Sequence, residues 1–211
     1  MPSIVGLGDF SNSDFKKVIK QFECSDDLKL FEYLKNNALT HHKQGLFQTY
    51  LFQDNEDYKG YISLASAQIA VDDTELRTIL GVSNGVPYPI SALKITRLCI
   101  SDQFKRQQIG SLLVMFAEIA AYEQQNKIGC RALLVDAKEK AIGFYESLGF
   151  NVLGDMEDGI CLMFKDIPSL RSKDIDHKVE QKEMVNEFID FCEAFNLPHF
   201  AKTFEKILSE E

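Results

Sequence analysis

The sequence has too few basic residues for a protein that coats nucleic acid. Its 211 residues include 23 lysines and arginines against 32 aspartates and glutamates, so the formal net charge is −9. Binding nucleic acid through overall charge requires a basic surface, and this balance argues against it. A local basic path is still compatible with the composition.

Long apolar runs and a disulfide pattern are also missing. No stretch approaches the ~18 consecutive apolar residues of a membrane-spanning helix. The start, MPSIVGLGDF, lacks the basic and apolar segments of a signal peptide. Five cysteines, an odd number without CxxC spacing, indicate reduced thiols. We therefore expect a cytoplasmic protein with no membrane partner, whose 45% hydrophobic residues suffice for one medium-sized domain.

Metal-ligand spacing is a third absence. Cys24, His41 and His42 come nearest to a cluster, but they do not have the spacing of a zinc site. We assign them to structure and expect no metal ion.

What is present is an alternation of helical and strand patterns. Residues 11–45 hold two helical patterns, and Ser25 before two aspartates is typical of the N-cap of the second. Residues 45–71 alternate as a strand hairpin, and residues 72–91 are irregular. From residue 92 the order is strand, loop, helix, strand, helix, strand. This order predicts an α/β fold with a mixed sheet.

The composition changes after Pro168, where a charged segment precedes an aromatic, amphipathic one. We interpret residues 1–168 as the main domain and 169–211 as a C-terminal helical extension, with Leu197-Pro198 separating two helices. Its phenylalanines indicate packing on the parent domain, with a homodimer surface or a partner's docking site as the alternative. They are Phe188, Phe191, Phe195, Phe200 and Phe204.

The segment FKRQQIGSLLV, residues 104–114, joins a predicted strand to an apolar helix. The first N–H groups of a helix have no internal partners and lie at the positive end of its dipole, so they attract anions. Lys105 and Arg106 add charge, and Gly110 allows close backbone approach. Such a loop can bind a diphosphate, although a plain structural turn has the same features.

A second motif, AIGFYESLGF at residues 141–150, follows at a characteristic separation. Together the two motifs resemble the GNAT superfamily of acetyl-CoA-dependent N-acyltransferases, whose loop reads Gln/Arg-x-x-Gly-x-Gly/Ala and whose helix reads A-x-x-φ-Y-x-x-x-G-F. The resemblance covers roughly residues 10–167 and implies a GNAT fold. That fold is a mixed, mostly antiparallel sheet with a splayed parallel strand pair and flanking helices.

The loop departs from the family pattern at two positions. Gln108 stands where the family usually has its first glycine, which would cost of order 1 kcal/mol if φ is positive there. Lys105 replaces Gln or Arg and offers a cation without the planar fork of arginine.

The resemblance also implies roles for individual residues. Backbone groups of the first splayed strand would hold the pantetheine, the loop would cradle the pyrophosphate, and Tyr145 would protonate the leaving thiolate. The expected coenzyme-binding residues are Leu98, Cys99, Ile100, Lys105, Arg106, Gln107, Gln108, Ile109, Gly110, Ser111 and Ala141. The structural alternatives are a core strand, a solvated loop and an aromatic anchor.

Within the superfamily, the chain is similar to the tRNA-acetylating toxins of bacterial toxin–antitoxin pairs. These enzymes acetylate the α-amine of aminoacyl-tRNA, and their antitoxin is a ribbon–helix–helix protein. The segment LKITRLCI contains no carboxylate that could act as a general base. The lack of a base there favours an α-amine acceptor, with a pKa near ~8, over a lysine side chain, with a pKa near ~10.4. A peptide N-terminus and a small-molecule amine are the other acceptors considered. A GNAT-like protein that binds CoA or a partner without turnover is the alternative from another class.

A tRNA substrate would require a basic face on this acidic chain. The residues available for it are few: Lys16, Lys17, Lys20, Arg97, Lys105, Arg106 and Arg131.

Overall fold

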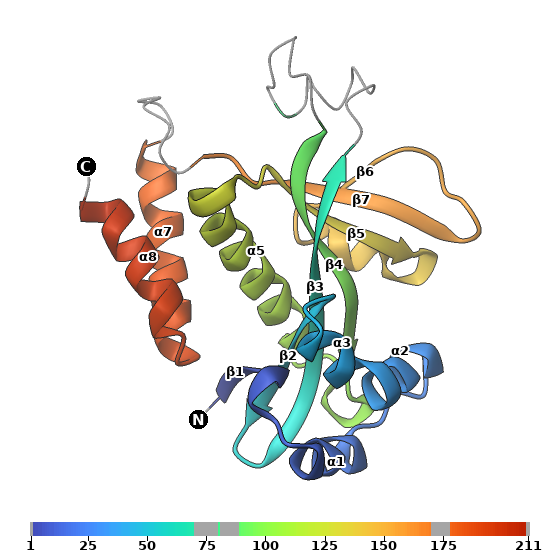
Figure 1. Cartoon of the computed structure of the whole chain (residues 1–211). Helices are drawn as coiled ribbons and strands as arrows, with labels where there is room; N and C mark the ends of the chain where they lie inside the picture. Colours follow the sequence, from blue (N-terminus) through green and yellow to red (C-terminus); the bar gives the residue numbers. More distant parts are fainter. Residues whose placement is uncertain (1, 70–79, 81–88, 170–177, 210–211) are drawn as a thin grey trace.

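The computed structural model describes residues 2–69, 80, 89–169 and 178–209, which build a seven-stranded sheet in the order β1-β2-β3-β4-β5-β7-β6 (Figure 1). The strands are β1 (Pro2–Gly6), β2 (Gln48–Asp54), β3 (Asp57–Ile69), β4 (Ile90–Ile100), β5 (Ala132–Lys138), β6 (Asn151–Val152) and β7 (Ile160–Asp166). Only β4 and β5 pair in parallel in this sheet. This confirms the predicted mixed, mostly antiparallel sheet. The two short edge strands, β1 and β6, have no counterpart among the elements predicted from the sequence.

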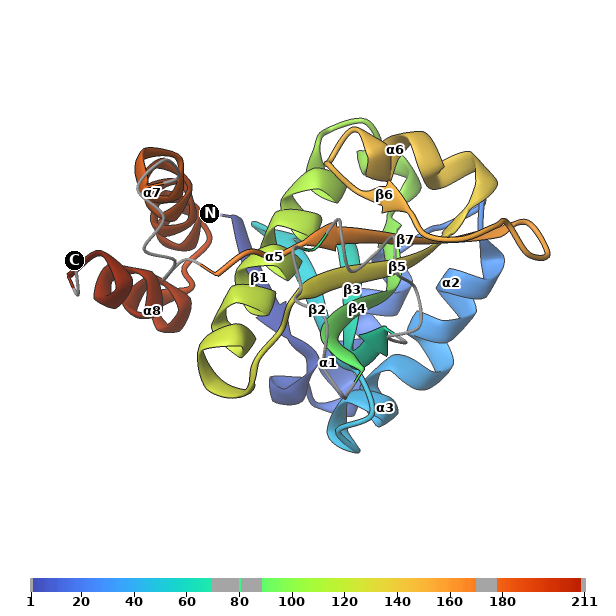
Figure 2. The same cartoon turned by 90° about the horizontal axis from the view of Figure 1, so that it is seen from above.

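Helices cover both faces of the sheet. They are α1 (Asn12–Gln21), α2 (Leu28–Tyr33), α3 (Leu39–Lys43), α5 (Ile109–Ile128), α6 (Ile142–Glu146), α7 (Lys178–Ala194) and α8 (Pro198–Ser209). Helices α1 to α3 lie on one face, and α5 and α6 lie on the other (Figure 2). Because side chains alternate along a strand, Leu51 packs in the core with α1 and α2, whereas its neighbour Phe52 packs in the core with α5.

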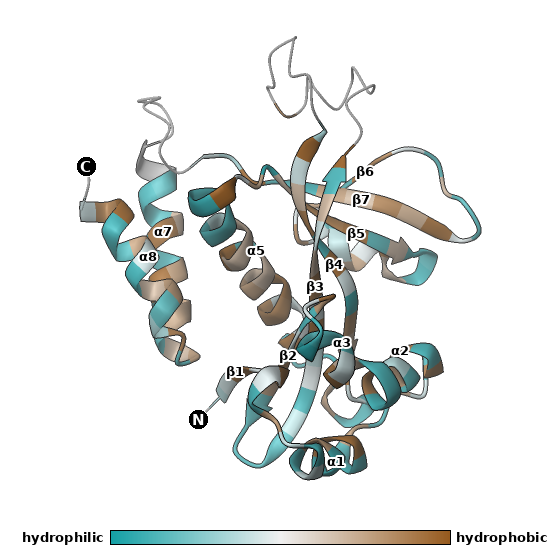
Figure 3. Ribbon diagram, in the orientation of Figure 1, coloured by the Kyte–Doolittle hydropathy of each residue, from teal (hydrophilic) through white to brown (hydrophobic). Residues whose placement is uncertain are grey.

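Helix α5 lies between the sheet and the C-terminal helices (Figure 1). Its Phe116 and Tyr122 contact Phe200 and Phe188, with ring centroids 5.7 and 5.4 Å apart. Apolar residues run along most of α5 (Figure 3), and a helix of that kind must be covered on several sides. The extension supplies this cover, so the expected packing of the tail on the parent domain is observed. Four of its five phenylalanines are buried within the chain and form no exposed surface: Phe188, Phe191, Phe195 and Phe204.

The predicted N-cap at Ser25 is wrong. Helix α2 begins at Leu28, after Asp27, which makes no side-chain cap hydrogen bond. The Ser25 backbone N–H instead donates to Asp102 Oδ2 at 2.8 Å, and the Asp27 carboxylate pairs with Lys138. Contacts with distant residues, and not local capping by Ser25, therefore hold this segment.

Other expectations concern cysteines, membranes and metals. All five cysteines are free and buried. Across residues 2–69, 80, 89–169 and 178–209, no helix has both the length and the apolar character to cross a membrane. The same residues contain no group of three or more His, Cys, Asp or Glu side chains that could hold a metal ion. The irregular stretch 72–91 lies largely outside the described residues.

Candidate active site

The parallel strands β4 and β5 separate halfway along their length. Residues 92–95 pair with residues 132–135, and the pairing then stops although both strands continue. At this point Thr96 is an extra residue in β4, because Ser63 pairs with Arg97 while Leu64 pairs with Ile95. Such a bulge bends a strand and increases its twist. The predicted splay is therefore present, and the edge of β4 beyond Ile95 has no pairing to β5.

A cavity of about 630 Å³ lies where the strands part, a volume typical of sites for small molecules and cofactors. It is lined by β4, β5, the loop before α5, the α6 region and the segment at residues 24–30. All but one of the predicted site residues line it: Leu98, Cys99, Ile100, Lys105, Arg106, Gln108, Ile109, Gly110, Ser111, Ala141 and Tyr145. Gln107 is the exception, because its exposed side-chain amide donates to the Gln103 carbonyl at 3.4 Å.

The loop before α5 has the backbone conformation of an anion site. Arg106 and Gln108 have φ angles of 61° and 62°. Successive backbone N–H groups in a turn of this kind form a concave set called a nest, which binds anions. The free N–H groups at the start of α5 adjoin this nest. The positive φ considered for Gln108 is confirmed, and each such non-glycine residue costs of order 1 kcal/mol, a strain typical of functional loops.

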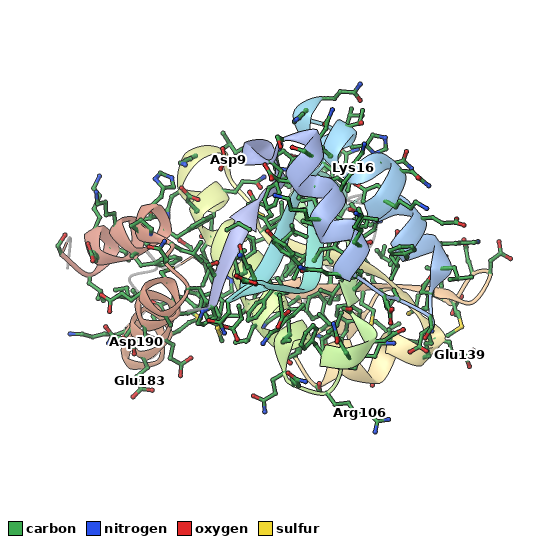
Figure 4. All side chains as sticks on the ribbon, turned by 90° about the horizontal axis from the view of Figure 1, so that it is seen from below. Asp9, Lys16, Arg106, Glu139, Glu183 and Asp190 are labelled. Carbon is green, nitrogen blue, oxygen red and sulfur yellow. The ribbon has the colours of Figure 1, made fainter. Side chains whose placement is uncertain are left out.

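The positive charge of Lys105 is balanced by two carboxylates that were not among the predicted site residues. Its Nζ lies 2.6 Å from Asp26 Oδ2 and 2.5 Å from Asp102 Oδ1. Both contacts raise the pKa of Lys105. The hydrogen bond from Lys105 is the largest of the effects that lower the pKa of Asp102 to about 2. The exposed Arg106 side chain points outward from the molecule (Figure 4). In this state the loop therefore presents backbone N–H groups more than free cations.

Gly110 has a packing role in addition to its place in the loop. A Cβ atom added there would lie 3.2 Å from Cζ of Phe144, which is tighter than an ordinary van der Waals contact. The glycine thus lets α6 approach the first turn of α5, and this approach helps to place Tyr145 at the cavity.

Tyr145 is anchored by aromatic rings and also lines the cavity. Its ring contacts Phe144 and Phe150 with centroids 5.0 and 5.3 Å away, and the side chain is 6% exposed. Burial raises the pKa of its phenol above the ordinary value. The hydroxyl therefore keeps its proton throughout the physiological pH range and can act as a donor.

Three of the seven expected basic residues, Arg97, Lys105 and Arg106, line the cavity, whereas Arg131 does not. The Arg97 guanidinium lies 3.6 Å from the centroid of the Tyr33 ring. Arg131 binds Asp166 at 3.0 Å, and its backbone N–H donates to the Ser91 carbonyl. This contact places it at the start of the parallel pair, at the end away from the loop.

Comparison with known proteins identifies the family. The family described as acetyltransferase (GNAT) domain matches residues 23–163. A tRNA-acetylating toxin of Mycobacterium tuberculosis is 27% identical over 147 residues, which cover 69% of this chain and 86% of the toxin.

Solved structures show the same fold. A tyrosine-to-phenylalanine mutant of the AtaT toxin, bound to the C-terminus of the antitoxin AtaR and acetyl-CoA, has a TM-score of 0.62 and 20% identity over 79% of this chain and 94% of that one. AtaT complexed with acetyl-methionyl-tRNAfMet has a TM-score of 0.63 and 23% identity over 77% of this chain and 94% of that one. The family match extends over more than half of the sequence, and the chain belongs to the GNAT acetyltransferase family.

Proposed function

We propose that acetyl-CoA is the acetyl donor of this N-acetyltransferase and that the α-amine of an aminoacyl-tRNA is its acceptor. The observation that carries the proposal is a single cavity bounded by the parted strands, the nest before α5 and Tyr145. The similarity to a tRNA-acetylating toxin supports the choice of acceptor, as does the likeness to a toxin complexed with an acetylated aminoacyl-tRNA.

The residues present suit acetyl-CoA, which when bound supplies an activated acetyl thioester. The nest at residues 105–108 and the first turn of α5 can hold the pyrophosphate through backbone N–H groups. The unpaired edge of β4 at Leu98, Cys99 and Ile100 can bind the amides of the pantetheine, since backbone groups freed from a sheet need partners. Tyr145 then donates its proton to the leaving sulfur.

The charges around the cavity favour an acceptor that needs little deprotonation. Its lining carboxylates are Asp26, Asp27 and Asp136, and each pairs with a lysine: Lys105, Lys138 and Lys94, respectively. A carboxylate held in an ion pair must leave its lysine before it can take a proton from a substrate amine. An α-amine, with a pKa near ~8, is partly unprotonated already, whereas a lysine side chain near ~10.4 is not.

The acceptor is tested by incubating the full chain with radiolabelled acetyl-CoA and three amines: aminoacyl-tRNA, a peptide with a free N-terminus and free amino acids. Uncharged tRNA, which has no α-amine, is the control. We expect label only with charged tRNA, released by mild base as an N-acetyl amino acid. Label in the peptide or the free amino acids would contradict the choice of acceptor. Binding of acetyl-CoA without transfer to any amine would support the non-catalytic alternative.

The relatives also suggest a protein partner. We propose that an antitoxin of the ribbon–helix–helix class binds this chain in the cytoplasm, as AtaR binds AtaT. The proposal predicts that induced expression of the chain stops growth and that co-expression of the product of a neighbouring antitoxin gene restores it.

The ion pairs of Lys105 predict a gain of coenzyme affinity in one variant. Asp26→Asn removes a carboxylate that competes with phosphate for Lys105. An exposed ion pair contributes ~0.2–1 kcal/mol, so acetyl-CoA should bind roughly 1.4- to fivefold more tightly. Lys105→Ala should weaken binding. Titration calorimetry measures both effects.

Asp54→Asn is the matched control for this experiment. Asp54 forms an ion pair of similar length, 2.8 Å, with Lys59, and neither residue lines the cavity. Its acetyl-CoA affinity should equal that of the parent chain. Weaker binding by Asp26→Asn would show that Asp26 supports the site instead of competing with it.

A further inference from the structure

Two thiols from distant parts of the chain meet in the wall of the cavity. Cys24 lies between α1 and α2, Cys99 lies in β4, and their Sγ atoms are 2.7 Å apart. Both side chains are buried and both line the cavity. A disulfide requires sulfur atoms about 2.05 Å apart, so little movement separates the present contact from a bond. We propose that Cys24 and Cys99 form a reversible disulfide, which makes this wall of the cavity an oxidant-sensitive site.

The surroundings make Cys24 the attacking sulfur. The Cys99 thiol donates a hydrogen bond to Cys24 Sγ. This bond lowers the pKa of Cys24 and raises that of Cys99. Burial of the side chain opposes this lowering of the Cys24 pKa, and the nearby Lys105 cation supports it by a smaller amount. Because the thiolate is the reactive form and this one borders a cavity, a small oxidant can reach it.

Hydrogen peroxide is a sufficient oxidant for the reaction. The Cys24 thiolate attacks one peroxide oxygen, the O–O bond breaks, and a sulfenic acid and hydroxide form. The Cys99 sulfur then attacks Cys24 Sγ, the S–O bond breaks, and water leaves with the Cys99 proton. The hydroxide takes up the proton that Cys24 had released. Two electrons pass from the thiols to the peroxide, which becomes two waters.

The bond would change the part of β4 that faces the coenzyme, a consequence that rests on the proposed function. Cys99 belongs to the three β4 residues proposed to hold the pantetheine. Cys24 begins a segment that includes Asp26 and Asp27, which pair with lysines at the cavity. A misplacement of about 1 Å can reduce a rate by about 100-fold. The smaller shift needed here should lower acetyl transfer by about tenfold.

The site is tested on the full chain treated with hydrogen peroxide, denatured and alkylated with N-ethylmaleimide. The reduced chain should take up one alkyl group on each of its five cysteines, and the oxidised chain should take up two fewer. Peptide mapping should locate the link between Cys24 and Cys99. Cys24→Ser should abolish the link, whereas Cys161→Ala, which removes a buried thiol outside the cavity lining, should retain it. No link, or a link between other cysteines, would overturn the proposal.

Activity is measured on the same samples. Acetyl transfer by the parent chain should fall about tenfold after peroxide and recover with dithiothreitol, and that of Cys24→Ser should not respond to peroxide. A linked chain with unchanged transfer and unchanged acetyl-CoA affinity would show that the site does not affect the cavity. If the reduced chain transfers no acetyl group, its acetyl-CoA affinity before and after oxidation serves instead. The alkylation and mapping results test the disulfide, and the transfer assay on the reduced chain tests the proposed function, so each proposal can fail independently of the other.

Discussion

Replacing Tyr145 by phenylalanine is expected to lower the rate of acetyl transfer by about 100-fold, in the range lost with one general acid. The ring contacts with Phe144 and Phe150 anchor the side chain, and phenylalanine can keep them. The substitution therefore removes only the hydroxyl of Tyr145, whose raised pKa keeps it protonated at the cavity. We therefore expect kcat to fall while the KM for acetyl-CoA changes by less than about twofold, which is the pattern of an interaction made mainly in the transition state.

Tyr122→Phe is the matched control for Tyr145→Phe. Tyr122 is also a buried tyrosine with a raised pKa, but its hydroxyl donates to Met184 Sδ at 3.6 Å and it does not line the cavity. Its variant should retain the parent rate in a steady-state assay of CoA release. If Tyr145→Phe kept the parent rate as well, the tyrosine would be an aromatic anchor and the proton would come from another group.

Replacing Phe204 by alanine is expected to lower the free energy of unfolding by about 3–5 kcal/mol, the usual cost of removing a buried phenylalanine. Phe204 is 0% exposed in α8, and its ring centroid lies 5.3 Å from that of Phe188 in α7. Both rings belong to the same core as α5. The loss should therefore appear as an earlier midpoint of a single urea transition followed by circular dichroism.

Phe200→Ala provides the comparison within the same helix. Phe200 is only half-buried and packs at the edge of this core against Phe116, so its loss should cost less than half as much. Two separate transitions, with Phe204→Ala shifting only one of them, would show that the C-terminal helices unfold independently. The division at residue 168 would then mark a separate unit.

The sequence determined those features that depend on neighbouring residues. Strand alternation and helical periodicity predicted the mixed α/β fold, the hairpin of β2 and β3 and the break between α7 and α8 at Leu197-Pro198. The loop before α5 and the motif at residues 141–150 are contiguous, so their residues could be named before the structure was known. β1 and β6 were missed because short edge strands carry too little periodicity to recognise.

Tertiary structure decided which distant groups meet at the cavity. Asp26 reaches Lys105 across 79 positions, Asp27 reaches Lys138 across 111, and Cys24 reaches Cys99 across 75. No periodicity records such pairs, since they depend on how the segment between α1 and α2 packs against the sheet. The local sequence therefore predicts that Asp26 and Asp27 lie in the first turn of a helix, whereas in the structure they pair with lysines from distant segments. That packing sets the charge of the loop and the reactivity of the two thiols. Electrostatic interactions and hydrogen bonds depend on the distance in space between two groups and not on their separation along the chain.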